Sequence, residues 1–199
     1  MKRVLFILFA FISIEAYAQD NSMWLQKGED MKLTFEFKNN KENVFNYLYA
    51  ESVFDKDKTG SAYIQYARDQ KWWEAPVYAH AEFRSFIDKD GISEMAFIVG
   101  PSFTLLDKSF GFMYLQPLYR YNGKHNYQLT LLTDMEYKRL YYTMFADMYG
   151  TEKVFLHSEN RFFFKVVKSF RVGLNCILTV NELKNGIKIQ PLGVIRIDL

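Results

Sequence analysis

The chain has 199 residues and a formal net charge of +2, a balance that gives no electrostatic case for a nucleic-acid polymer as partner. Its only cysteine is Cys176, so no disulfide can form within the chain. Aromatic residues make up 18% of the sequence, a bias typical of β-strands and of the aromatic girdles of membrane barrels.

The N-terminal residues have the three parts of a secretory signal peptide. Two basic residues precede the apolar run 4–14, and the A-x-A cleavage site of residues 16–18 follows. The apolar run is too short to form a spanning helix. We therefore expect export with cleavage after Ala18, which leaves a signal peptide at 1–18 and a single barrel domain at 19–199.

From residue 31 onward the sequence reads as strands separated by turn signals every ~10–15 residues, the spacing of an all-β protein. Asn-Gly and Asp-Gly pairs mark several of the turns. The predicted strands are Met31–Lys38, Val44–Phe54, Ser61–Asp69, Val77–Ile87, Ser93–Leu106, Phe110–Tyr121, Asn126–Asp134, Leu140–Tyr149, Lys153–Ser158, Arg161–Val167, Phe170–Val180 and Ile187–Leu199. No segment shows a helical period over three turns. The pattern predicts an antiparallel up-and-down transmembrane β-barrel of about 12 strands, with 10 as the alternative.

The segment 77–88 carries the clearest alternation of side-chain character. Its odd positions, from Val77 to Ile87, are almost all apolar, whereas its even positions include His80, Glu82 and Arg84. A membrane barrel would turn the apolar face to lipid and the charged face to the lumen. A soluble lipocalin-like barrel would reverse this assignment, so the two readings predict opposite faces.

Three prolines fall inside predicted strands. Pro101, Pro117 and Pro191 each lack the N–H group that a strand donates to its neighbour. These prolines therefore count against a barrel in which every strand is paired on both sides, and only bulges or strand ends, which the sequence does not reveal, would absorb them.

The sequence contains no known catalytic motif. It has no G-x-S-x-G, no H-E-x-x-H, no glycine-rich phosphate loop and no Cys/His cluster, and its three histidines are far apart. We expect neither enzymatic activity nor a metal site nor a cofactor.

The inward positions supply candidates for a lumen wall. They are Tyr49, Glu51, His80, Glu82, Arg84, Gln128, Asp134, Phe145, Asp147, Glu159, Arg161, Asn175 and Arg196. Aromatic faces suit stacking with a base, and amide or carboxylate groups suit sugar hydroxyls. Charges inside a narrow barrel must be paired or hydrated, so the same residues could instead fill the lumen as a plug of salt bridges.

Six short blocks of the sequence resemble, in their order along the chain, a family of unknown function similar to Tsx-like nucleoside-specific channel-forming outer-membrane proteins. The blocks are 51–60, Val99-Gly100-Pro101-Ser102, Tyr127-Gln128-Leu129-Thr130, 145–149, 157–163 and Pro191-Leu192-Gly193-Val194. The resemblance implies a twelve-stranded barrel with a narrow, aromatic-lined lumen that passes nucleosides. The sequence departs from the family pattern at residues 148–149 and 160–161. The resemblance therefore supports the inferred fold more strongly than the inferred substrate.

Together these observations predict an outer-membrane barrel of a Gram-negative bacterium that passively conducts or binds a small solute. The resemblance to Tsx-like channels implies, more specifically, that this solute is a nucleoside. The expected partners are the lipid bilayer, lipopolysaccharide and the solute, and a monomer is expected. The alternatives are a soluble periplasmic or secreted lipocalin-like ligand-binding barrel and a plugged structural barrel.

Overall fold

The computed structural model describes residues 20–27, 31–41, 44–54, 61–71, 77–88, 91–150, 154–181 and 186–199. The predicted signal peptide lies outside these residues. The regular structure of these residues is entirely β: β1 (Asp20–Lys27), β2 (Met31–Lys41), β3 (Val44–Phe54), β4 (Ser61–Lys71), β5 (Val77–Asp88), β6 (Gly91–Lys108), β7 (Gly111–Tyr121), β8 (His125–Tyr137), β9 (Leu140–Tyr149), β10 (Phe155–Val167), β11 (Phe170–Asn181) and β12 (Ile187–Asp198).

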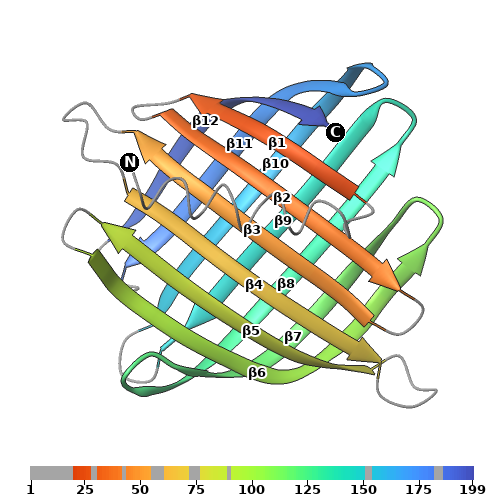
Figure 1. Cartoon of the computed structure of the whole chain (residues 1–199). Coiled ribbons are helices and arrows are strands. Elements are labelled where there is room, and N and C mark those ends of the chain that lie inside the picture. The colour runs from red at the N-terminus through yellow and green to blue at the C-terminus, as the bar shows by residue number, and fades with distance from the viewer. Residues whose placement is uncertain are drawn as a thin grey trace.

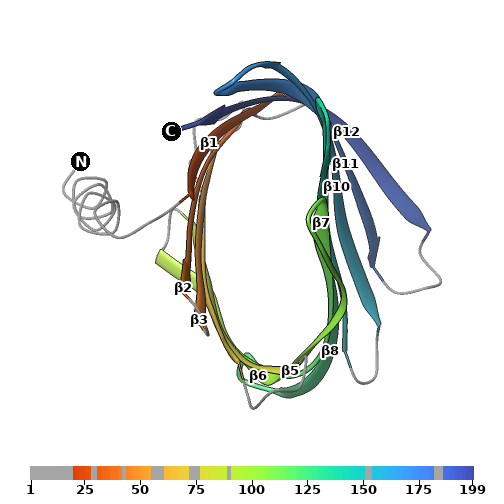
Figure 2. The same ribbon diagram turned by 90° about the vertical axis from the view of Figure 1, so that its right-hand side faces the viewer.

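The twelve strands form one closed antiparallel barrel in which each strand pairs with its neighbours in sequence (Figure 1). The first and last strands complete the wall through a register that runs from Ser22 opposite Asp198 to Lys27 opposite Gly193. Figure 2 shows that the closed wall has an elongated cross-section rather than a circular one. The prediction of a twelve-stranded antiparallel barrel is confirmed. Among the described residues, no helix has the length and hydropathy needed to cross a bilayer.

The predicted number of strands is right, but only because two errors cancel: the first strand was not predicted, and one continuous strand was predicted as two. Residues Asp20–Lys27 form β1, which was not predicted, because its inward positions include Ser22 and Gln26 and the segment lacks an apolar run. Conversely, the predicted break at Glu159-Asn160 does not exist, because β10 is continuous. Glu159 pairs with Arg161 inside the barrel, and polar residues therefore do not mark a turn here.

The faces of the strands follow the membrane-barrel assignment. On β5, His80, Glu82 and Arg84 are buried, whereas Ala79 and Ala81 are exposed. On β6, Phe97 is 56% exposed and its neighbour Ile98 is fully buried. Because the apolar positions point outward, the arrangement is the reverse of the one that a lipocalin-like barrel requires.

The three prolines occupy two kinds of position. Pro191 is paired with Cys176 of β11, but it lies beyond Gly193, the last residue of β12 that pairs with β1 in the described part of the chain. Pro101 and Pro117 lie opposite each other in the middle of the β6–β7 ladder, where the pairing is interrupted. Proline has no N–H to donate, which explains why the ladder is broken at this place.

Gly173 on β11 is required by the close approach of β10. A Cβ atom at this position would lie 2.0 Å from the carbonyl oxygen of Phe162. Gly173→Ala is therefore expected to lower the free energy of unfolding by about 1–3 kcal/mol, the usual cost of overpacking. Gly193→Ala is the matched control, because its Cβ would lie 3.9 Å from the nearest atom, the carbonyl oxygen of Lys27. Urea titration of the two folded variants measures the difference, and equal stability of both would contradict the steric argument.

Candidate functional site in the barrel lumen

The barrel encloses a cavity of about 370 Å³ that is lined by side chains from β2 to β10. Ten of the predicted lumen residues line it: Tyr49, Glu51, His80, Glu82, Arg84, Asp134, Phe145, Asp147, Glu159 and Arg161. The other three, Gln128, Asn175 and Arg196, are buried beside it. Gln128 donates to Asp147, Asn175 donates to Glu159, and Arg196 lies 3.7 Å from Glu36.

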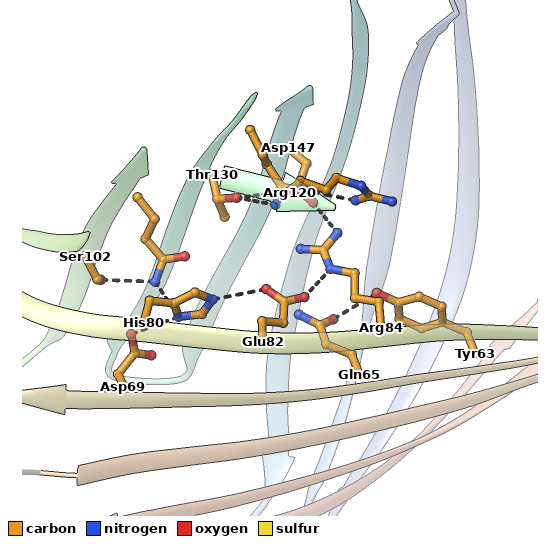
Figure 3. Close-up of polar contacts among 12 residues, drawn as sticks. Tyr63, Gln65, Asp69, His80, Glu82, Arg84, Ser102, Arg120, Thr130 and Asp147 are labelled. Carbon is orange, nitrogen blue, oxygen red and sulfur yellow. Dashed lines mark hydrogen bonds and ion pairs between the residues drawn. The ribbon is translucent and has the colours of Figure 1, made fainter. Parts of the chain in front are cut away.

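A chain of ionisable side chains runs along β5 and the neighbouring wall (Figure 3). His80 lies between two carboxylates, with its Nδ1 2.9 Å from Asp69 Oδ1 and its Nε2 3.2 Å from Glu82 Oε2. Arg84 Nε donates to the other oxygen of Glu82. The alternation of β5 produces this chain, because residues two apart point to the same side of a strand.

Arg84 connects two strands of the barrel that are not neighbours, β5 and β9. Its Nη1 donates to Asp147 Oδ2 at 2.5 Å, although β5 and β9 are separated in the sheet by three strands. Asp147 Oδ1 also accepts hydrogen bonds from Thr130 at 2.5 Å and from Gln128 at 3.1 Å. The ion pair therefore crosses the lumen and is held on its β9 side by hydrogen bonds.

Two further contacts join walls that are not adjacent. Lys38 Nζ of β2 lies 3.4 Å from Asp134 Oδ2 of β8. Arg161 Nη2 of β10 donates to the hydroxyl of Tyr49 on β3 at 3.4 Å, and that hydroxyl donates to Glu51 at 2.8 Å. The sequence did not predict these three cross-lumen contacts, because pairing across a barrel depends on the tilt and stagger of the strands.

Trp24 of β1 is an interior residue that the sequence analysis missed. It is 1% exposed, and the guanidinium groups of Arg161 and Arg196 lie 4.3 Å and 5.0 Å from its ring centre. Its indole N–H donates to Ser22 Oγ at 2.8 Å, and the ring of Phe163 meets it edge-on at 5.8 Å. The alternation of Ser22, Trp24 and Gln26 was the available signal for this inward face.

A row of aromatic rings follows one side of the cavity. Phe45 stacks with Tyr47 at 6.4 Å, Tyr47 with Tyr49 at 6.3 Å, and Tyr49 meets Tyr63 edge-on at 6.0 Å. All four line the cavity. Of these four, only Tyr49 is among the predicted lumen residues, although the spacing of two residues from Phe45 to Tyr49 already places these rings on one face.

Carboxylates outnumber cations on the wall of the cavity. Among the described residues, the lysines and arginines are Lys32, Lys38, Arg84, Arg120 and Arg161, the histidines are His80 and His157, and the acidic residues are Glu36, Glu51, Asp69, Glu82, Glu94, Asp134, Asp147 and Glu159. Each of these acids has a basic or histidine partner within 4.0 Å. The cavity is therefore highly polar but not positively charged. Within the described ranges, no group of three or more His, Cys, Asp or Glu residues is placed to hold a metal ion.

Three donors of this wall have no protein acceptor within the described part of the chain. They are Arg84 Nη2, Arg120 Nε and Arg161 Nε, all buried. Buried N–H groups are ordinarily hydrogen-bonded to protein, water or a bound molecule. The lumen therefore offers three guanidinium donors to an oxygen of water or of a solute.

Solved structures of porins resemble the fold. A KdgM porin in complex with disordered oligogalacturonate superposes with a TM-score of 0.58 and 9% sequence identity, over 90% of this chain and 99% of that one. Another KdgM porin structure gives a TM-score of 0.57 and 10% identity with the same coverage of both chains. No family model and no curated protein sequence matches the chain. At this identity the likeness shows the shared twelve-stranded barrel fold alone.

Proposed function

We propose that this protein is an outer-membrane barrel that passively conducts or binds a small polar solute. The polar cavity inside a closed wall is the observation that carries the proposal. Its unpaired guanidinium donors and its row of aromatic rings are suited to contact a solute. The likeness to porins supports a channel as the class of function.

The outer surface supports insertion into a bilayer. Large apolar side chains are exposed on most strands, including Leu25, Met95, Phe97, Val99, Leu105, Phe162, Leu174, Ile189 and Ile195. A soluble protein rarely exposes so extensive an apolar surface. Exposed tyrosines lie beside turns at both ends of the barrel, with Tyr121 and Tyr127 at one end and Tyr137 at the other, as in the girdles of membrane barrels.

The lengths of the hairpin turns suggest an orientation. The turns at 109–110, 138–139 and 168–169 are two residues long, and they lie at the end of the barrel where β1 begins and β12 ends. Short turns are typical of the periplasmic side of outer-membrane barrels. This end would then face the periplasm of a Gram-negative bacterium, with the opposite end toward lipopolysaccharide, and we propose a monomer.

A neutral solute with a planar or ring-shaped body fits the cavity better than a polyanion. Aromatic rings stack on such a body, and neighbouring carboxylates and guanidinium groups can bind its hydroxyls. The excess of carboxylates disfavours an anionic chain such as the oligogalacturonate bound by the KdgM porin. Within this class of neutral solutes we propose a nucleoside, the solute implied by the Tsx-like resemblance.

Conductance of single barrels in planar bilayers tests the proposal. The purified barrel should give discrete conductance steps, and a nucleoside added to the bath should block them more strongly than oligogalacturonate at the same concentration. A folded, inserted barrel that neither conducts nor binds any neutral solute would overturn it.

A closed structural barrel is the second candidate, favoured by the three cross-lumen contacts that include Arg84 with Asp147. It predicts full insertion with no conductance of the native protein, and it is distinguished from the first candidate by the same recording.

Substitution of Tyr47 tests the aromatic row. Tyr47→Ala removes the central ring of the row and is expected to weaken nucleoside block by about 1–3 kcal/mol, the range measured for base–aromatic stacking. Concentration-dependent block of the conductance measures this change. Tyr66→Ala is the matched control, because Tyr66 lies on the outer face of β4 and is 44% exposed. Equal weakening by both substitutions would exclude a role for the row in solute binding.

A further inference from the structure

The wall of the barrel has a seam between β6 and β7 that is not closed by a continuous ladder. Val99 pairs with Tyr119 and Phe103 pairs with Leu115, and the pairing is interrupted over the three positions between. The register on either side places Pro101 opposite Pro117. Neither proline has an N–H to donate, so this opposed pair cannot form its two reciprocal hydrogen bonds.

The break is confined to the seam, which we define as residues 100–102 of β6 and 116–118 of β7. On its other side Pro101 pairs with Ala79 of β5, and Pro117 pairs with Leu129 of β8. Over the seam, each strand is therefore paired with its other neighbour, β5 or β8, whereas the backbone pairing between the two strands is interrupted. Gly100 packs against Pro117 so closely that a Cβ atom would lie 2.7 Å from the proline carbonyl oxygen.

A groove of about 500 Å³ lies along the seam and extends to β9. Within the described part of the chain, all of its lining residues are uncharged: Val99, Gly100, Pro101, Pro117, Leu118, Tyr119, Tyr127, Gln128, Leu129, Met148, Tyr149, Gly150 and Val154. Val99, Leu129 and Met148 belong to the exposed outer face, whereas Leu118 and Gln128 are buried side chains of the inner face. Residues of both the outer face and the inner face therefore line the groove.

The inner side of the wall behind the seam is mixed: Ser102 and Gln116 are buried polar residues joined by a hydrogen bond of 3.0 Å, and an apolar cluster lies beside them. Ala96, Ile98 and Leu118 form a buried cluster there, in an interior that is otherwise rich in charge. Tyr149 lines both the groove and the lumen cavity, and its ring lies 4.6 Å from the guanidinium carbon of Arg120. Tyr149 is thus shared by the groove and the polar lumen cavity.

We propose that this groove is a lateral binding site for one acyl chain of a membrane lipid. The uncharged lining fits a hydrocarbon, and the groove is continuous with the apolar outer face that meets lipid in the proposed function, on which this inference rests. The interrupted ladder gives the chain access to the wall without rupture of backbone hydrogen bonds, which a continuous ladder would require.

Photolabelling tests the site with the full-length folded barrel in phosphatidylcholine vesicles. The probe is a sixteen-carbon fatty acid that carries a diazirine, and adducts are mapped by mass spectrometry of peptides. Adducts are expected to be enriched on Leu118 and Tyr149, compared with the fully lipid-facing reference residues Phe162 and Leu174. Uniform labelling of all four positions would overturn the proposal.

Restoring the ladder should close the site. Pro101→Val with Pro117→Val returns both N–H donors, and labelling of Leu118 is expected to fall roughly tenfold. Pro191→Val is the matched control, because Pro191 lies beyond the pairing of β1 and β12, and it should leave the labelling unchanged. Undiminished labelling of the double variant would overturn the proposal.

Two further readouts keep the test decisive. Met148→Trp fills the groove from its outer face without change to either proline, and it should also reduce labelling of Leu118 if the double variant fails to fold. A stable dimer of the barrel together with an absence of lipid adducts in the groove would show that a second copy of the chain occupies the groove and would overturn the proposal. Extraction of the protein from membranes without detergent would contradict the proposed function itself, whereas normal insertion without enrichment in the groove would contradict only this inference.

Discussion

Arg84→Met is expected to lower the free energy of unfolding by about 3–5 kcal/mol, the cost of removing one partner from a buried ion pair. The side chain of Arg84 is 10% exposed, and those of Glu82 and Asp147 are each 2% exposed. Without the guanidinium group, both carboxylates stay inside the barrel with weaker compensation. Urea titration of the barrel refolded in lipid measures the loss, provided that the slope of the transition is unchanged.

The same substitution should change permeation. Arg84 crosses the lumen to reach Asp147, so its replacement by an uncharged side chain removes both the contact and a positive charge. We expect a larger single-channel conductance and a stronger preference for cations. An unchanged conductance would show that the contact does not obstruct the lumen.

A charge-matched variant shows whether Arg84→Met lowers stability through uncompensated charge or through lost packing of the arginine side chain. In Arg84→Met with Glu82→Gln and Asp147→Asn, no carboxylate of this group remains uncompensated. This triple variant is expected to recover much of the stability, because neutral amides are less costly to bury than unpaired charges. If it is as unstable as Arg84→Met alone, the loss comes from packing of the arginine stem rather than from charge.

Trp24→Ala is expected to cost about 3–5 kcal/mol, the range for truncation of a large buried aromatic side chain. The substitution removes the ring between Arg161 and Arg196, the edge-on contact with Phe163, and the donor to Ser22. Because Trp24 belongs to β1, the loss falls on the strand that closes the barrel against β12. Heat-modifiable migration on gels and urea titration both report the weakened closure.

Leu25→Ala is the control for Trp24→Ala. Leu25 is the next residue of the same strand, but it faces outward and is 40% exposed. Its truncation should leave the closure nearly unchanged in detergent. Comparable destabilisation by both substitutions would mean that β1 tolerates no change, and would remove the specific role assigned to the indole ring.

The alternation of side chains predicted the barrel because it is a local property of each strand. The even positions of β5 and the odd positions of β6 could be assigned to opposite faces without knowledge of any partner strand. Strand limits were harder, because a polar pair such as Glu159-Asn160 has the composition of a turn. Its true partners, Arg161 and Tyr142, cannot be identified from the local sequence.

The site was predictable as a list of inward residues but not as a set of contacts. The parity rule places Arg84 and Asp147 in the interior, yet their distance depends on the stagger of five consecutive strands. The opposed prolines show the same limit, because each proline was visible in the sequence and their mutual register was not. Long-range register is therefore the information that a single sequence did not supply.

The pairing of β1 with β12 has a consequence for the order of assembly. One edge of β1 pairs with β2, but the other edge, at residues 22–27, pairs only with residues 193–198 of β12. One edge of each of these two strands therefore stays unpaired until nearly all of the described chain is present. Such an edge readily pairs with another chain, and contacts so distant in sequence form slowly. Until the barrel closes, these two edges are therefore the places where the folding chain is most exposed to pairing with another chain.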